Sequence, residues 1–131
     1  MEISVRRVFA RVLAVAEPDA DQPAVEADEL RVSLDLNPEQ WRAVFAAWYG
    51  TDTWPAPVAV AAPEPLTLQG VPAWRYAGAR ADARGCSAYW RAYLVPHGRS
   101  AGVVRSVRWR PTDLTRYGPA LDQAATDLHI F

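Results

Sequence analysis

The middle of the chain constrains the fold most, because it carries a complete set of helix signals. Asn37 is a suitable N-cap, Pro38 suits the first helical position, and Gln40 stands where the partner of a capping box belongs. Apolar side chains then recur at the i, i+3, i+4 and i+7 spacing of one helical face: Trp41, Val44, Phe45 and Trp48. We therefore predict a helix over Pro38–Tyr49, ended by Gly50, with this face buried against a sheet.

Two strands are expected before this helix. The apolar residues within 3–16 fit either a helical stripe or one face of a strand, and the valine content favours the strand. Residues 17–29 are rich in acids and are expected to form a solvated loop, since they lack the spacing of a calcium loop. Alternation over Leu30–Leu36 predicts the second strand, which would pair with the first as a hairpin.

The rest of the chain predicts more strands and a second helix. Four prolines within 51–65 forbid a central strand and indicate a connection or a short edge strand. After a turn near Gly70, loops separate three strand candidates: Ala73–Ala77, Cys86–Val95 and Gly102–Arg110. Pro111 stops the last strand, one helical turn follows, and Gly118–Pro119 restarts a helix at the C-terminus.

These elements fit one domain. The chain has 131 residues, half of them hydrophobic, which suits one core and is short for two. We predict a single α+β domain over residues 1–131, with the Pro-rich connection inside it. Its antiparallel sheet would have about five to six strands, covered on one face by the mid-chain helix and the C-terminal helix.

Charge is distributed unevenly along the chain. Residues 1–66 hold five arginines against eleven acids, whereas residues 67–117 hold nine arginines against two acids. The chain has no lysine, which the codon usage of a GC-rich genome explains, so every cation is a planar fork that grips carboxylates or phosphates. Such segregation produces a directional field that steers a charged partner but does not identify it.

Arginines and aromatic residues alternate in the basic segment. Period-two alternation sends Trp90 and Leu94 toward the core and leaves Arg91 between two tyrosines on the other face. We expect one exposed binding face to which seven residues contribute: Arg75, Tyr76, Tyr89, Arg91, Tyr93, Arg108 and Arg110. The alternative is a solvated sheet surface whose arginine stems cover apolar neighbours. Strand register decides between the two, and the sequence leaves it open.

Signals for catalysis are few. Cys86 has no base nearby in the sequence and only Asp82 as a nearby acid, and His129 suits the C-terminal end of a helix. We therefore expect no catalytic site among Cys86, His97 and His129. The chain has no zinc-protease, phosphate-loop, dinucleotide or calcium-loop motif, and we expect no metal site and no cofactor. A single cysteine excludes an intrachain disulfide.

The sequence therefore favours a small non-catalytic binding protein with a protein partner, in an immunity-, adaptor- or chaperone-like role. Single-stranded nucleic-acid binding through the arginine and aromatic face is the alternative, although the pI of about 6.1 lacks the usual basic excess. A small hydrolase or isomerase is a second alternative. The N-terminus resembles neither a signal peptide nor a membrane span, so we expect a cytoplasmic protein without membrane contact. The oligomeric state stays open.

Overall fold

The computed structural model describes residues 2–13, 23–52, 59–60, 63–81, 87–107, 109 and 111–127. Along the chain the elements are β1 (Ser4–Val12), β2 (Ala24–Arg31), α1 (Pro38–Asp52), β3 (Ala59–Val60), β4 (Glu64–Leu68), β5 (Val71–Ala81), β6 (Ser87–His97), β7 (Ser100–Val107) and α2 (Pro111–Asp127). The expected α+β fold, with one antiparallel sheet and a mid-chain and a C-terminal helix, is confirmed.

The sheet has seven antiparallel strands in the order β1-β2-β7-β6-β5-β3, and β4 also pairs with β5. The expected meander of three strands is present as β5, β6 and β7. The turn predicted near Gly70 joins β4 to β5, and Gln69 and Gly70 both have the positive φ that a tight hairpin turn requires. The Pro-rich segment contributes to the short strands β3 and β4, which pair with β5 at one edge of the sheet, as its prolines indicated.

Helix α1 begins with the predicted capping box. The backbone N–H of Gln40 donates to Asn37 Oδ1 at 2.8 Å, and the N–H of Asn37 donates to Gln40 Oε1 at 2.9 Å. Trp41, Phe45 and Trp48 are buried, as expected. The helix continues to Asp52, so the prediction that Gly50 ends it is wrong.

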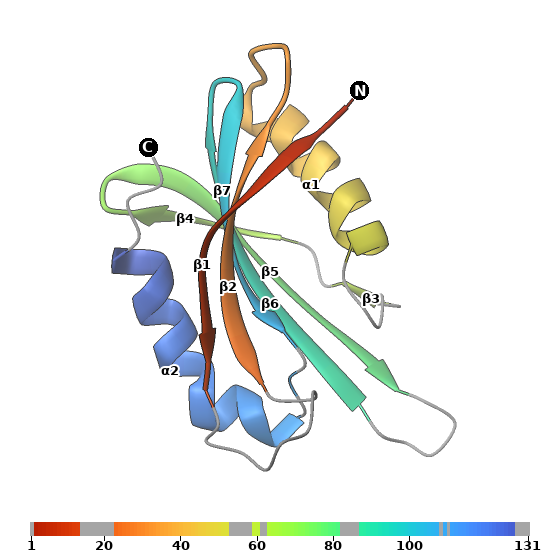
Figure 1. Ribbon diagram of the computed structural model, residues 1–131, viewed down its shortest axis with the longest axis vertical. Helices are drawn as coiled ribbons and strands as arrows, with labels where there is room; N and C mark the ends of the chain where they lie inside the picture. Colours follow the sequence, from red (N-terminus) through yellow and green to blue (C-terminus); the bar gives the residue numbers. More distant parts are fainter. Residues whose placement is uncertain are drawn as a thin grey trace.

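The two helices lie on opposite faces of the sheet, which corrects the expectation that both cover one face (Figure 1). One core joins the apolar face of α1 to Leu30, Leu94 and Val103, and the other joins α2 to Val104 and Tyr93. Neighbouring residues of β6 and β7 thus enter different cores, as the pleat dictates. An apolar stripe on a helix shows that it packs on a sheet but not on which face.

The second strand lies earlier in the sequence than predicted. Alternation indicated Leu30–Leu36, but β2 spans Ala24–Arg31, and the following residues leave the sheet. There the N–H of Val32 donates to the carbonyl of Arg99 at 2.9 Å, and the N–H of Leu36 donates to that of Gly98 at 3.1 Å. The acids expected in a solvated loop are therefore partly in β2, where arginines of the neighbouring strands neutralise them.

Helix α2 is one continuous element, whereas a single turn followed by a second helix was predicted. Pro119 lies inside it and cannot donate a backbone hydrogen bond, and the helix bends in its middle (Figure 1). Leu121 and Ala125 are buried against the sheet, as expected. Just before the helix, the indole N–H of the buried Trp109 donates to the carbonyl of Ala24 at 2.9 Å.

Truncation of the α1 face tests this packing. Phe45 is fully buried and its ring lies 4.6 Å from that of Tyr76, so Phe45→Ala removes the centre of one core. We expect the free energy of unfolding to fall by about 3–5 kcal/mol in chemical denaturation. Ala46→Ser, at an exposed position of the same helix, is the control and should change it by less than about 0.5 kcal/mol. Equal effects of the two substitutions would contradict the assignment of the face.

Candidate functional site

Strand pairing brings three of the seven predicted binding residues together. Arg75 on β5 lies directly opposite Tyr93 on β6, and Arg91 is two residues before Tyr93, so all three share one face. Tyr89 belongs to the same face by alternation, although the structure does not describe its side chain. Arg108 and Arg110 lie outside the described residues.

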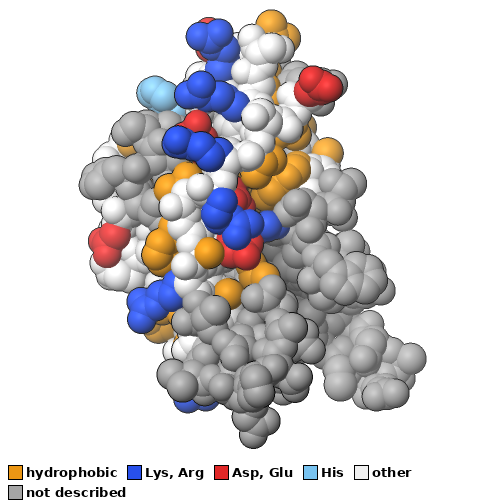
Figure 2. Space-filling view, viewed as in Figure 1, with side chains coloured by type: hydrophobic (Ala, Val, Ile, Leu, Met, Phe, Trp, Pro, Cys, Tyr) orange, Lys and Arg blue, Asp and Glu red, His pale blue; other side chains and the backbone are white. Residues whose placement is uncertain are grey.

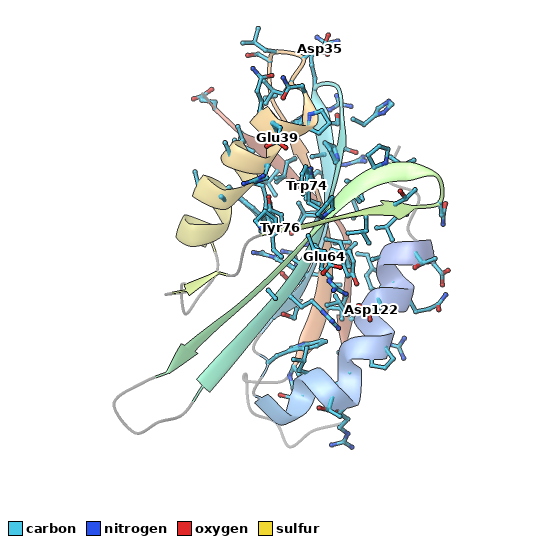
Figure 3. All side chains as sticks on the ribbon, turned by 180° about the vertical axis from the view of Figure 1, so that it is seen from behind. Asp35, Glu39, Glu64, Trp74, Tyr76 and Asp122 are labelled. Carbon is cyan, nitrogen blue, oxygen red and sulfur yellow. The ribbon has the colours of Figure 1, made fainter. Side chains whose placement is uncertain are left out.

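This shared face is largely covered, which corrects the expectation of an open arginine and tyrosine surface: Tyr93 is buried, and Arg75 and Arg91 are partly buried. Helix α2 covers it: Tyr93 is 4% exposed and its hydroxyl donates to Asp122 Oδ1 at 2.6 Å. The guanidinium of Arg91 donates to Asp122 Oδ2 at 3.4 Å. Tyr76 lies on the opposite face, buried against α1, while Asp122 lies on the side of α2 (Figure 3). The sequence reasoning failed here because it placed both helices on one side.

A glycine of α2 lies close to this face. Gly118 is buried within α2, and a Cβ there would lie 3.2 Å from Nη1 of Arg91. A glycine in a helix interior costs stability. At position 118 the absence of a side chain leaves room for the guanidinium of Arg91. Arg75 pairs with Glu64 of β4 on the same side of the sheet. These contacts fasten α2 and β4 to the sheet.

Tyr93 is held in its protonated form. Burial raises the pKa of its hydroxyl above the ordinary value of 10.0, and the hydrogen bond to Asp122 raises it further. Burial raises the pKa of Tyr76 in the same way. Both hydroxyls are therefore neutral donors at physiological pH, which is the property that a structural hydrogen bond requires.

A second charged cluster lies on the α1 face, between β1, β2 and β7. Arg105 of β7 is 6% exposed, and its Nη2 lies 3.5 Å from Glu26 and 3.7 Å from Asp28 of β2. Arg7 of β1 reaches the same two acids, with 3.0 Å between its Nη1 and Glu26 Oε1. The guanidinium carbon of Arg105 lies 4.9 Å from the ring centroid of Trp48, a cation–π contact with α1. Two cations and two anions thus compensate one another.

The other side of β2 carries a smaller cluster. Glu29 accepts from Arg6 at 3.1 Å and pairs with Arg31 at 3.3 Å. The acid is buried, whereas the side chains of Arg6 and Arg31 are 73% and 68% exposed. In this cluster the carboxylate of Glu29 therefore lies beneath the two guanidinium groups, which face the solvent.

Strand β1 is the least covered element of the sheet. It stands at one end of the strand order, and no strand in the described part of the chain pairs with its outer side. Every residue from Ser4 to Arg11 is exposed, and only the flanking Ile3 and Leu13 pack against the cores. The described residues include four exposed large hydrophobic side chains, and three of them are on β1: Val5, Val8 and Phe9.

Arginines follow β1 and continue past its first residue. Figure 2 shows them in a row from the end where β7 begins, down across β1. Three hollows lie there, with volumes of about 510, 630 and 210 Å³, and Arg31 lines all of them. Arg99 and His97 line the first, Ile3 the second and Arg6 the third. We call this row and the outer side of β1 the β1 edge.

The described residues add little chemistry beyond these contacts. His97 is exposed at the end of β6, while Cys86 and His129 lie outside the described residues, so the expectation about their chemistry stays a prediction. Within the described ranges, no three His, Cys, Asp or Glu side chains gather in a way that could hold a metal ion. Among the helices described, neither α1 nor α2 is long and apolar enough to cross a membrane.

A tyrosine variant tests the contact between Tyr93 and Asp122. Tyr93→Phe should lower the free energy of unfolding by about 1 kcal/mol at neutral pH, because it removes a hydrogen bond to a partly exposed carboxylate. Above about pH 10 an unfolded tyrosine ionises while folded Tyr93 keeps its proton, so the stability of the natural protein falls as the pH rises.

The variant lacks this ionisation, and its stability should fall less steeply in denaturation series between pH 8 and about 11. Parallel curves for the two proteins would show that Tyr93 is not buried against Asp122.

Comparisons with known proteins support the fold. No family model and no curated protein matches the sequence. The structure is similar to that of PA94 from Pseudomonas aeruginosa, a protein of unknown function, with a TM-score of 0.60 at 15% identity over 99% of this chain and 83% of the other. It is also similar to LpqN of Mycobacterium tuberculosis, which is involved in cell envelope biogenesis, with a TM-score of 0.52 at 12% identity over 92% and 79%. At these identities the likeness concerns the fold alone.

Proposed function

We propose that this protein is a non-catalytic binding protein that holds an extended segment of a partner protein along the β1 edge. The observation that carries the proposal is the outer side of β1, which no described strand covers, on a strand that exposes Val5, Val8 and Phe9. A strand has backbone donors and acceptors on both sides, and β2 uses those on one side of β1. An extended peptide that adds to the other side would satisfy the rest.

The contrast between the two edges of the sheet supports this choice. At the opposite edge of the sheet, β3 has only two residues. Strand β4 contains Pro65, and Pro63 comes directly before the strand. Prolines and short strands are the usual means by which an edge is protected from pairing. Strand β1 has nine residues and no proline. A bulge at Val8, between Arg7 and Phe9, interrupts its ladder with β2.

The nucleic-acid alternative finds less support in the described residues. Base stacking needs exposed aromatic faces, but Tyr76, Tyr93 and Trp109 are buried. Among the described residues of β1, Phe9 has the one aromatic side chain, so contacts of β1 with nucleic acid would be mainly with phosphates. We retain a cytoplasmic location as part of the proposal, on the sequence grounds given above.

Photo-crosslinking along β1 tests the proposal. A benzoylphenylalanine placed at Val5 or at Phe9, both exposed, should crosslink in cells to one segment of the same partner protein. Because β1 pairs these two residues with Leu30 and Ala27 on β2, the two sites in the partner should be three or four residues apart. Peptide mass spectrometry of the adducts measures this spacing.

The same amino acid at Thr115, which is exposed on α2, is the matched control. The proposal fails if Thr115 gives the same adducts, if Val5 and Phe9 crosslink to unrelated segments, or if the adducts are with nucleic acid.

A further inference from the structure

We infer that the segment bound along the β1 edge is an acidic strand and not a second copy of β1. The inference rests on the proposed function and specifies its partner. Three features favour it: the acidic strand that already pairs with β1, the exposure of the arginines, and the charge of β1 itself.

Strand β2 shows which kind of strand β1 pairs with. Its three acids each lie within 3.1 Å of an arginine of β1: Glu26 and Asp28 contact Arg7, and Glu29 contacts Arg6. These acids point to both faces of the sheet, since Glu29 is adjacent to Asp28. An acidic strand is therefore accepted on the inner side of β1 through cross-strand ion pairs.

The arginines retain donors for a strand on the outer side. A guanidinium has five N–H donors, and the contacts with β2 use one or two of them. The side chains of Arg6 and Arg31 are mostly exposed, and Arg11 is exposed as well, whereas the acids beneath are buried. A carboxylate arriving from solvent therefore has several exposed guanidinium groups to contact, and Figure 2 shows arginines along this side of the molecule.

The same charges oppose the pairing of two β1 strands. Two copies side by side would bring Arg6, Arg7 and Arg11 of each into one ribbon, with the acids of β2 on the far sides. Like charges across a strand pair are unfavourable, and edge charges are a known protection against self-association. The arginines therefore select against a second copy and for a partner of opposite charge.

The hollow next to the start of β1 extends this selection. Ser4 pairs with Arg31, and Arg31 shares a hollow of about 510 Å³ with Arg99, His97 and Ser100. Asp35 also lines this hollow and lies 3.9 Å from Arg99. A segment that continued past Ser4 and turned toward β2 would therefore meet Arg31 as the arginine without this acidic partner.

Synthetic peptides separate the chemistry of the partner from strand addition. The probes are a ten-residue peptide of alternating Glu and Val, its Gln and Val counterpart, a peptide with the Glu and Val residues in two blocks, and a fifteen-nucleotide oligothymidylate. Fluorescence anisotropy at 50 and 500 mM salt measures each Kd. We expect the alternating acidic peptide to bind at least about tenfold more tightly than the Gln peptide at low salt, with a smaller difference at high salt.

Variants assign this preference to β1. Arg11→Gln should reduce binding of the acidic peptide by about threefold and leave the Gln peptide unchanged, as expected for one exposed ion pair. Arg116→Gln, at an exposed position of α2, is the matched control and should change neither. Thermal unfolding of both variants verifies that they fold.

The outcomes distinguish the two proposals. Equal affinities of the Glu and Gln peptides would overturn the acidic partner but leave strand addition intact. Equal binding of the alternating and block peptides would overturn strand addition, because charge alone would then suffice. Absence of binding by both alternating peptides overturns the inference, and so does tighter binding of the oligothymidylate, which would favour nucleic acid.

Discussion

The arrangement of β1, β2 and β7 depends on the contacts made by the buried guanidinium of Arg105. A charge with 6% exposure must be compensated, and Glu26 and Asp28 of β2 compensate it while Trp48 of α1 covers it. This requires β2 to pair with β7 in the observed register, with Glu26 directly opposite Arg105. Arg7 shares the same two acids, so the network also ties β1 to the sheet. Strand β1 is thus attached by its ladder and by ion pairs rather than by burial, and its other side stays in the solvent.

Local signals in the sequence predicted the parts of the fold whose determinants are close together. The Asn37 cap and its partner Gln40 are three residues apart, and the face of α1 repeats within two turns. The acids of β2 were misassigned to a loop because their partners are distant: Arg7 is 21 residues from Asp28, and Arg105 is 79 residues from Glu26. An acid in a strand is plausible only once an arginine is known to lie opposite.

The predicted binding site illustrates the same limit. Alternation correctly placed Arg91 and Tyr93 on one face, and the strand register, which the sequence left open, adds Arg75 to it. Alternation carried no information on which helix would cover that face. The β1 edge was missed because the apolar residues within 3–16 fit both a helical stripe and one face of a strand, and either fit predicts a buried face. The structure shows instead a strand whose side chains from Ser4 to Arg11 are exposed on both faces, which an apolar pattern alone does not reveal. Part of the charge that is segregated along the sequence is neutralised within the molecule, where acids of β2 pair with arginines of β1 and β7.

The central claim is that β1 is paired on one side and open on the other, and native-state hydrogen exchange measured by NMR tests it most directly. In the free protein the amides of β1 should fall into two groups, one protected by β2 and one exchanging as fast as exposed loops. The amides of β2 and β7, which are paired on both sides, should show no such division. Addition of the alternating Glu and Val peptide should slow the fast group alone. Uniform protection along β1 in the free protein would contradict the account, since it would mean that the outer side is already covered.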